Sequence, residues 1–87
     1  MKMEDNKQDL PKWFDGTTYD EGDTVANRFT GEEIKLNNIE LSMYDLIMGA
    51  TMCIEMGMMN KDILQTHQKG LQWFIKHNPK AYMVLLD

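Results

Sequence analysis

The chain has 87 residues and a formal net charge of −5 at pH 7, with nine Lys and Arg against 14 Asp and Glu. A chain of this length suits a single small domain with a limited core, for which association with a second chain is a common supplement. The acidic balance argues against a nucleic-acid backbone or an anionic membrane as the main partner, because both require clustered Lys and Arg, and Arg28 is the only arginine.

The first ten residues, MKMEDNKQDL, are dense in charged and amide side chains and hold little that could be buried. We expect residues 1–10 to form a flexible tail and residues 11–87 to form one small α+β domain. In that domain an N-terminal β-hairpin layer packs on an antiparallel helix pair, and a short C-terminal helix closes one end.

The region from residue 12 to residue 36 alternates short β-prone runs with turn signals. The clearest hairpin pairs Thr24–Phe29 with Glu32–Leu36, and Gly31 supplies the positive φ of the turn. Thr30 is a poor first residue for a two-residue turn, which favours a longer loop. The stretch Trp13–Tyr19 is a candidate third strand. Because an isolated hairpin is marginal in water, this layer must lean on the helices.

The stretch from Leu41 to Asn60 predicts a helix that is poor in polar residues. Ser42 and Asp45 have capping-box spacing at its start. Gly57 can adopt the left-handed conformation that stops a helix, although Met58 and Met59 could also extend the helix to a break at Asn60. Helical periodicity places a core face on one side, made of Met43, Leu46, Ile47, Ala50, Cys53, Ile54 and Gly57. On the opposite face, methionines stand where a solvated helix usually carries Lys, Glu and Gln: Met48, Met52, Met56 and Met59.

A second helix is predicted to begin after the N-cap Asn60 and to end by Asn78, because the residue before Pro79 avoids the α region. Its apolar face is expected to contain Ile63, Leu64, His67, Gly70, Leu71, Phe74 and Ile75. Trp73 and His77 fall at the edge of that face, where an indole beside an imidazole could receive a small ligand or a partner side chain, although we favour a core edge. Asn78 and Pro79 then start a short C-terminal helix whose apolar residues should dock on the core.

The residues that could carry chemistry form no complete site. Asp20, Glu21 and Asp23 crowd around a glycine but lack the ligand spacing of a calcium loop, so we interpret them as an acidic turn. The soft metal ligands lack zinc-site spacing and are limited to Cys53, His67 and His77. We therefore predict no metal ligand, no cofactor and no catalytic residue, and tight metal binding should not be needed for folding.

The compartment is inferred from the cysteine and from the apolar stretches. The single cysteine, Cys53, permits no internal disulfide, and no charged segment followed by an apolar run opens the chain. The longest apolar stretch, Leu46 to Met59, is shorter than the roughly 20 apolar residues of a membrane-spanning helix. We expect a protein of the reducing cytoplasm without a membrane segment.

Four stretches of the chain carry a resemblance to other sequences: NRFTGEE at 27–33, LSMYD at 41–45, GLQWF at 70–74 and AYMVLLD at 81–87. With these stretches the chain resembles small uncharacterised proteins encoded by tailed phages of marine cyanobacteria and other marine bacteria. The resemblance implies a setting, the host cytoplasm during infection. It implies no activity, cofactor or site residue.

The stripe of Met48, Met52, Met56 and Met59, which we call the methionine stripe, predicts a contact surface. A monomer seldom exposes a large apolar patch, so we predict a non-enzymatic protein–protein interaction or regulatory protein that self-associates, most simply as a homodimer. A host or phage protein is a further candidate partner. Methionine adapts to varied surfaces, and a glycine beside the stripe permits close approach of a second backbone. The predicted interaction residues are Met48, Met52, Met56, Met59 and Gly49.

Two alternatives stay open. The hairpin or the C-terminal helix could cover the methionine stripe within one chain, which would make these residues ordinary core. The protein could also be a small ligand-binding protein or an enzyme. Its site would then lie among Cys53, His67, Trp73 and Tyr44, because Cys53 and His67 are on the inward faces of successive helices.

Overall fold

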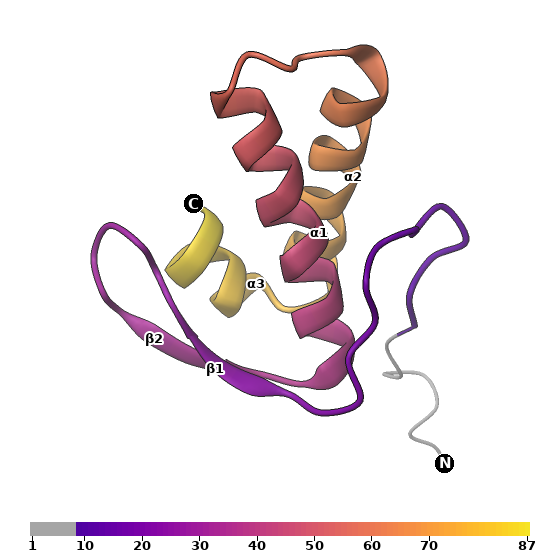
Figure 1. Ribbon diagram of the computed structural model, residues 1–87. Helices are drawn as coiled ribbons and strands as arrows, with labels where there is room; N and C mark the ends of the chain where they lie inside the picture. Colours follow the sequence, from indigo (N-terminus) through magenta and orange to yellow (C-terminus); the bar gives the residue numbers. More distant parts are fainter. Residues whose placement is uncertain (1–8) are drawn as a thin grey trace.

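The computed structural model describes residues 9–87, so most of the predicted flexible tail, residues 1–8, lies outside the described residues. A two-stranded antiparallel sheet is followed by two long helices and a short helical C-terminus, which confirms the predicted α+β class (Figure 1). The elements are β1 (Asp23–Ala26), β2 (Glu33–Leu36), α1 (Asn38–Glu55), α2 (Lys61–His77), α3 (Pro79–Ala81) and a π-helical turn, η2 (Tyr82–Leu86).

The predicted hairpin is confirmed, with a loop of six residues, 27–32, between its strands. Val25 faces Ile34 across the strands, and Gly31 has the positive φ, 79°, that the turn requires. Asn27 organises the loop: its Oδ1 accepts hydrogen bonds from the backbone N–H groups of Phe29 and Thr30 at 2.7 and 3.0 Å. Its Nδ2 donates to the carbonyl of residue 84 on η2 at 2.9 Å, so the loop is tied to the C-terminus.

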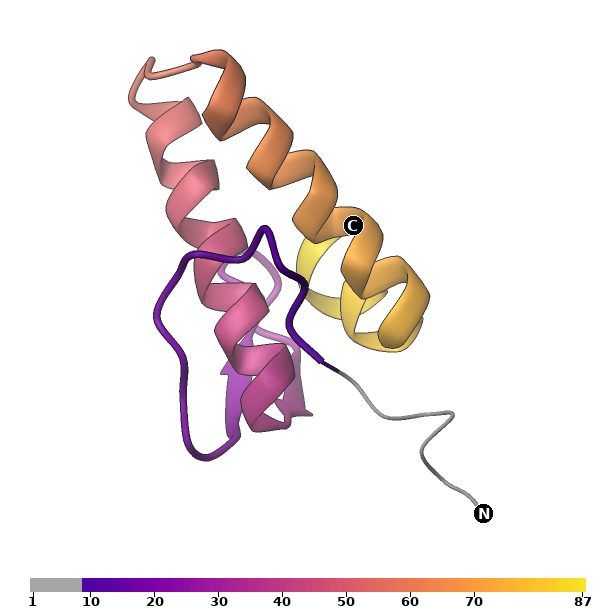
Figure 2. The same ribbon diagram turned by 90° about the vertical axis from the view of Figure 1, so that its right-hand side faces the viewer.

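The candidate third strand is not formed. Residues 9–22 contain no strand and instead run as irregular chain along the helices, as Figure 2 shows. Leu10, Trp13 and Phe14 are partly buried and pack against the core from this segment. The apolar residues of this stretch are therefore buried by packing on the helices, and the stretch does not pair with the hairpin as a third strand.

The predicted start of the first long helix is wrong by one turn. Asn37 is the N-cap, and its side chain accepts from the N–H of Glu40 at 2.7 Å while the Glu40 carboxylate accepts from the N–H of Asn37 at 2.9 Å. This Asn and Glu pair is a complete capping box and replaces the weaker pair that begins at Ser42. Ser42 is buried inside the helix, where its hydroxyl donates to the carbonyl of Asn38 and accepts from the N–H of Tyr19.

The end of α1 follows the first of the two predicted possibilities, the stop at Gly57. Gly57 has φ 88°, its N–H donates to the carbonyl of Ile54 at 3.0 Å, and the N–H of Met58 donates to the carbonyl of Cys53 at 2.9 Å. This pair of bonds is a Schellman motif, which satisfies carbonyls that the helix leaves free. The Asn60 side chain then caps α2 by accepting from the N–H of residue 63 at 2.9 Å.

The core lies where α1, α2, β2 and the C-terminal helix meet, and its buried members are Leu36, Met43, Ile47, Trp73, Phe74, Ala81 and Leu85. The buried face of α2 is turned from the predicted one. Trp73 is 8% exposed, whereas Leu64 and Ile75, both predicted core residues, are 44% and 48% exposed. The N-terminal segment contributes to the burial of Trp73, because the carbonyl of Asp9 accepts a hydrogen bond from the Trp73 indole.

The helix pair gives the molecule its elongated shape, with principal extents of 46 × 31 × 21 Å. Figures 1 and 2 show the sheet, the C-terminal helix and the N-terminal segment gathered around one half of the pair. The other half, with the connection between α1 and α2, extends beyond them. Among the described residues, no helix is long and apolar enough to cross a membrane.

Gly70 of α2 is buried and packs tightly against Ile47 of α1. A Cβ at this position would lie 2.5 Å from Cγ1 of Ile47. We expect Gly70→Ala to lower the free energy of unfolding by about 1 kcal/mol. The cost of overpacking, about 1–3 kcal/mol, exceeds the gain of about 1 kcal/mol that alanine brings in helix propensity. Urea denaturation measures this change.

The control for Gly70→Ala is the same substitution in an Ile47→Ala background, where the opposing atoms are missing. There the change should stabilise the fold, since only the gain in helix propensity remains. Equal effects of Gly70→Ala in the two backgrounds would contradict a steric role for Gly70.

Candidate functional site

The free end of the helix pair carries exposed methionines from the last turn of α1 and the connection. Met52, Met56, Met58 and Met59, which we call the methionine surface, are 55%, 72%, 50% and 59% exposed. A solvent-exposed cluster of large, flexible apolar side chains is unusual on a monomer and is typical of a contact surface. Three of the four predicted stripe residues therefore lie at this end, and Met58 joins them.

Met48, the fourth stripe residue, is half-buried and lies elsewhere. It lines a hollow of about 190 Å³ between the hairpin loop, α1, α2 and the C-terminus, together with Phe29, Leu71 and Leu86. The alternative in which the hairpin and the C-terminal helix cover the stripe is therefore correct for Met48. It does not apply to the methionine surface.

Gly49 is exposed and borders a second hollow, of about 450 Å³, between α1 and α2. A Cβ at Gly49 would have no atom within 4 Å, so the helix surface is open there. The apolar part of this hollow, which we call the Gly49 hollow, is formed by Leu46, Gly49, Ala50, Cys53 and Ile63. Met52 and Met56 follow Gly49 by three and seven positions, so they lie on the same side of α1, beside the hollow.

Charged groups surround this end of the molecule. The rim of the Gly49 hollow carries the carboxylates of Asp15, Asp45 and Asp62. Arg28 of the hairpin loop forms a bidentate salt bridge with Glu55 at the end of α1. The rim of the Gly49 hollow is therefore acidic, which matters for any partner of the same charge.

The four residues of the predicted alternative site do not converge. Tyr44 and His67 line the hollow of about 190 Å³ beside Met48, whereas Cys53 lines the Gly49 hollow. Trp73 lines a third site, between the N-terminal segment and α2. Burial raises the pKa of the Tyr44 hydroxyl, and the positive charge of Arg28 partly opposes that rise. Only Tyr44 and His67 share a site, so the arrangement does not place a thiol beside an imidazole base.

His67 is held by a short chain of hydrogen bonds. The Thr51 hydroxyl donates to the carbonyl of Ile47 at 2.9 Å. The Nε2 atom of His67 lies 3.1 Å from the hydroxyl oxygen of Thr51. Because a hydroxyl has a single proton to donate, Thr51 must accept from His67, so His67 carries a proton on Nε2. This arrangement agrees with a structural histidine and does not itself create a base for catalysis.

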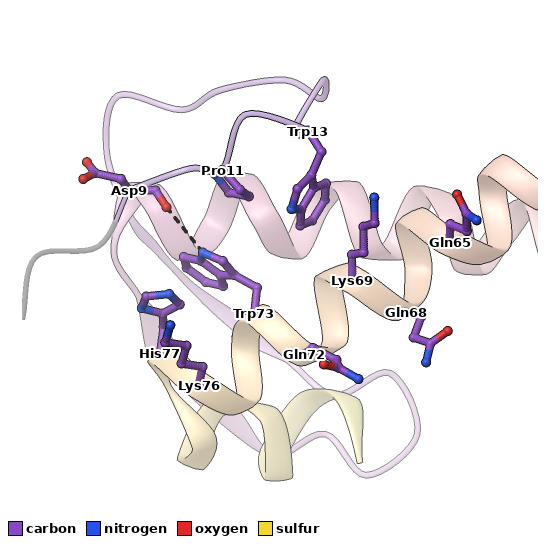
Figure 3. Close-up of a pocket in the computed structure, with 10 residues that line it drawn as sticks. All are labelled: Asp9, Pro11, Trp13, Gln65, Gln68, Lys69, Gln72, Trp73, Lys76 and His77. Carbon is purple, nitrogen blue, oxygen red and sulfur yellow. Dashed lines mark hydrogen bonds between the residues drawn. The ribbon is translucent and has the colours of Figure 1, made fainter.

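A groove of about 750 Å³ runs between the N-terminal segment and α2 (Figure 3). Pro11 and Trp13 come from the segment, whereas Lys69, Trp73 and His77 come from α2. The Trp73 indole N–H donates to the carbonyl of Asp9 at 3.3 Å, and its ring lies 4.5 Å from the His77 ring at 34°. We call this feature the tryptophan groove.

The sequence indicates Trp73 as a candidate site residue and places it with His77 at the edge of a helix face. It predicts a possible strand for Trp13, however, and so does not predict the tryptophan groove. No local pattern links the two segments, because Trp73 and Asp9 are separated by 64 positions. The excess of Lys and Gln along one side of α2 is the available signal, but the same pattern is typical of an ordinary solvated face.

No group of three or more His, Cys, Asp or Glu residues within residues 9–87 is placed to hold a metal ion. The acidic turn, with Asp20 and Glu21, lies beside a shallow hollow at the start of α1. No family model, curated protein or solved structure matches the chain.

Proposed function

We propose that this is a non-enzymatic interaction protein that self-associates through the methionine surface and the Gly49 hollow. The observation that carries the proposal is the exposure of four methionines at the free end of the helix pair, from 50% for Met58 to 72% for Met56. Such a patch is stabilised when another apolar surface removes it from water. The resemblance to small phage proteins suggests the host cytoplasm during infection as the setting.

A second copy of the chain is the partner that the shape favours. A two-fold interface uses the same surface patch on both copies, so that patch must contain both a projection and a recess. Met52 and Met56 project from the side of α1 on which Gly49 opens the adjacent hollow. Methionines of one copy can therefore enter the hollow of the other, and the reverse contact follows by symmetry.

The acidic rim makes this association sensitive to salt. Asp15, Asp45 and Asp62 surround the hollow, and two copies would bring these like charges together. Added salt screens the repulsion and leaves the apolar contact in place, so we expect the dimer dissociation constant to fall as ionic strength rises. Analytical ultracentrifugation at low and high salt measures this change.

The interface itself is tested with Met52→Glu combined with Met56→Glu. Both side chains are exposed, so the double variant should keep its helical circular dichroism spectrum and its melting profile at low protein concentration. It should run as a monomer in size-exclusion chromatography with light scattering, whereas the unchanged protein should run as a dimer. The expected loss of dimer affinity is at least about tenfold, because four carboxylates would enter an apolar contact.

Met83→Glu is the matched control, because Met83 is 68% exposed but belongs to η2, outside the methionine surface. It should dimerise like the unchanged protein. A monomeric unchanged protein at high concentration would rule out self-association. If Met83→Glu lost the dimer equally, the contact would not be specific to the methionine surface.

A further inference from the structure

We propose that the tryptophan groove binds a small ligand that combines a planar ring with an anionic group, either a carboxylate or a phosphate. Its volume of about 750 Å³ lies within the usual range for small-molecule sites. Trp13 and Pro11 line one side and α2 lines the other, so a flat molecule can enter between them (Figure 3). None of the residues of the methionine surface lines this groove, so the inference does not depend on self-association.

The ring of the ligand would contact an aromatic wall that is already in place. Trp73 is 8% exposed and is held from two directions, by its hydrogen bond to the carbonyl of Asp9 and by its stacking on His77. Trp13 is half-buried on the opposite segment, and its ring lies 5.7 Å from Lys69 Nζ. Because both rings already make these contacts, a planar ligand gains stacking contacts at a small cost in side-chain entropy.

The anionic group is inferred from the charges along the groove. Lys69 and Lys76 line it, and among the described residues Asp9 is the only acidic one in its lining. Figure 3 shows the Asp9 carboxylate turned away from the groove, while the Lys69 ammonium lies beside the Trp13 ring. The groove is therefore locally positive on a chain whose net charge is −5. An anion gains charge-assisted hydrogen bonds from lysine there.

Amide side chains complete the polar side of the groove. Gln65, Gln68 and Gln72 line it along α2 and offer both donors and acceptors. These groups suit the polar edge of a ring or the remaining oxygens of a carboxylate or phosphate. A purely apolar ligand would leave the lysines and amides without compensation for lost water, which is unfavourable.

The groove carries its own spectroscopic probe, because both tryptophans of the chain, Trp13 and Trp73, line it. The experiment titrates the full chain with benzoate, adenosine monophosphate, adenosine and inorganic phosphate, and follows tryptophan fluorescence excited at the red edge of the indole band. Benzoate and adenosine monophosphate supply the ring with a carboxylate or a phosphate. Adenosine and inorganic phosphate supply the ring and the anion of adenosine monophosphate separately.

We expect a saturable fluorescence change with benzoate or adenosine monophosphate, and the tighter of the two identifies the preferred anion. Adenosine and inorganic phosphate should each bind at least about tenfold more weakly, because each lacks one of the two contacts. The absence of a saturable change with both combined probes would overturn the proposal. Equal affinity for adenosine and adenosine monophosphate would remove the role of the lysines.

The lysines are tested by Lys69→Gln combined with Lys76→Gln, which should weaken binding of the tighter probe about tenfold or more. The matched control is Lys61→Gln combined with Lys80→Gln, which makes the same change in net charge outside the groove. All four lysines are exposed, so folding should be retained. Equal weakening by both pairs would show a general effect of charge and would count against a site in the groove.

Discussion

Replacing Phe74 with Ala should lower the free energy of unfolding by about 3–5 kcal/mol, the range for deleting a fully buried aromatic side chain. Phe74 is 0% exposed, and its ring packs edge-on against Trp73 with the centroids 5.3 Å apart. For a domain of this size each kcal/mol lowers the melting temperature by about 4–8 °C. Thermal and urea denaturation followed by circular dichroism measure the loss.

Phe29→Ala is the matched control for Phe74→Ala. Phe29 is 83% exposed on the hairpin loop, where its ring lies under Arg28 with 4.9 Å between the guanidinium carbon and the ring centroid. An exposed contact of this kind contributes little, so we expect a change within about 0.5–1 kcal/mol. Similar losses from the two substitutions would mean that the core is not centred on Phe74.

The second large effect is expected from Glu40→Ala. Glu40 is 6% exposed, and its two carboxylate oxygens accept hydrogen bonds at 2.9 Å from the Asn37 N–H and from Asn78 Nδ2. The Asn78 side chain in turn caps α3 by accepting from the N–H of Ala81 at 3.1 Å. One carboxylate therefore joins the start of α1 to the start of the C-terminal helix.

Removing this carboxylate should lower the free energy of unfolding by about 2–4 kcal/mol. The loss combines a helix cap of about 1 kcal/mol with partly buried donors that are left without their acceptor, at about 1–3 kcal/mol. Glu40→Gln keeps one acceptor oxygen and should show an intermediate loss. Glu33→Ala, at an exposed position of β2, is the control and should be nearly neutral. A loss for Glu40→Ala no larger than that for Glu33→Ala would refute the linking role.

The start of α1 shows why a correct principle can be applied at the wrong residue. Both Asn37 with Glu40 and Ser42 with Asp45 have capping-box spacing, and the predicted start rests on the second pair alone, which directly precedes the apolar stretch. The structure uses the first pair, whose carboxylate also reaches Asn78 across 38 positions of sequence. That distant bond could not be read from the local pattern.

The candidate interaction surface was predicted in part. Met52, Met56 and Met59 were expected on one uncovered side, and all three are more than half exposed. Met48 has the same residue type and the expected helical spacing, yet it is half-buried against the hairpin loop and the C-terminus. Periodicity places residues on a helix face, but it does not say how far along that face the neighbouring elements extend.

The sequence by itself determined the local features: the hairpin with Gly31, the helix stop at Gly57, the cap at Asn60 and the helix start at Pro79. These depend on backbone preferences and on partners within a few residues, so they can be read from neighbouring positions. Only the tertiary structure decided that α2 buries Trp73, that the segment around Trp13 forms a groove with α2, and that one end of the helix pair stays uncovered. These features depend on the packing of segments far apart in the chain, and packing is settled by the shape and volume of the whole core.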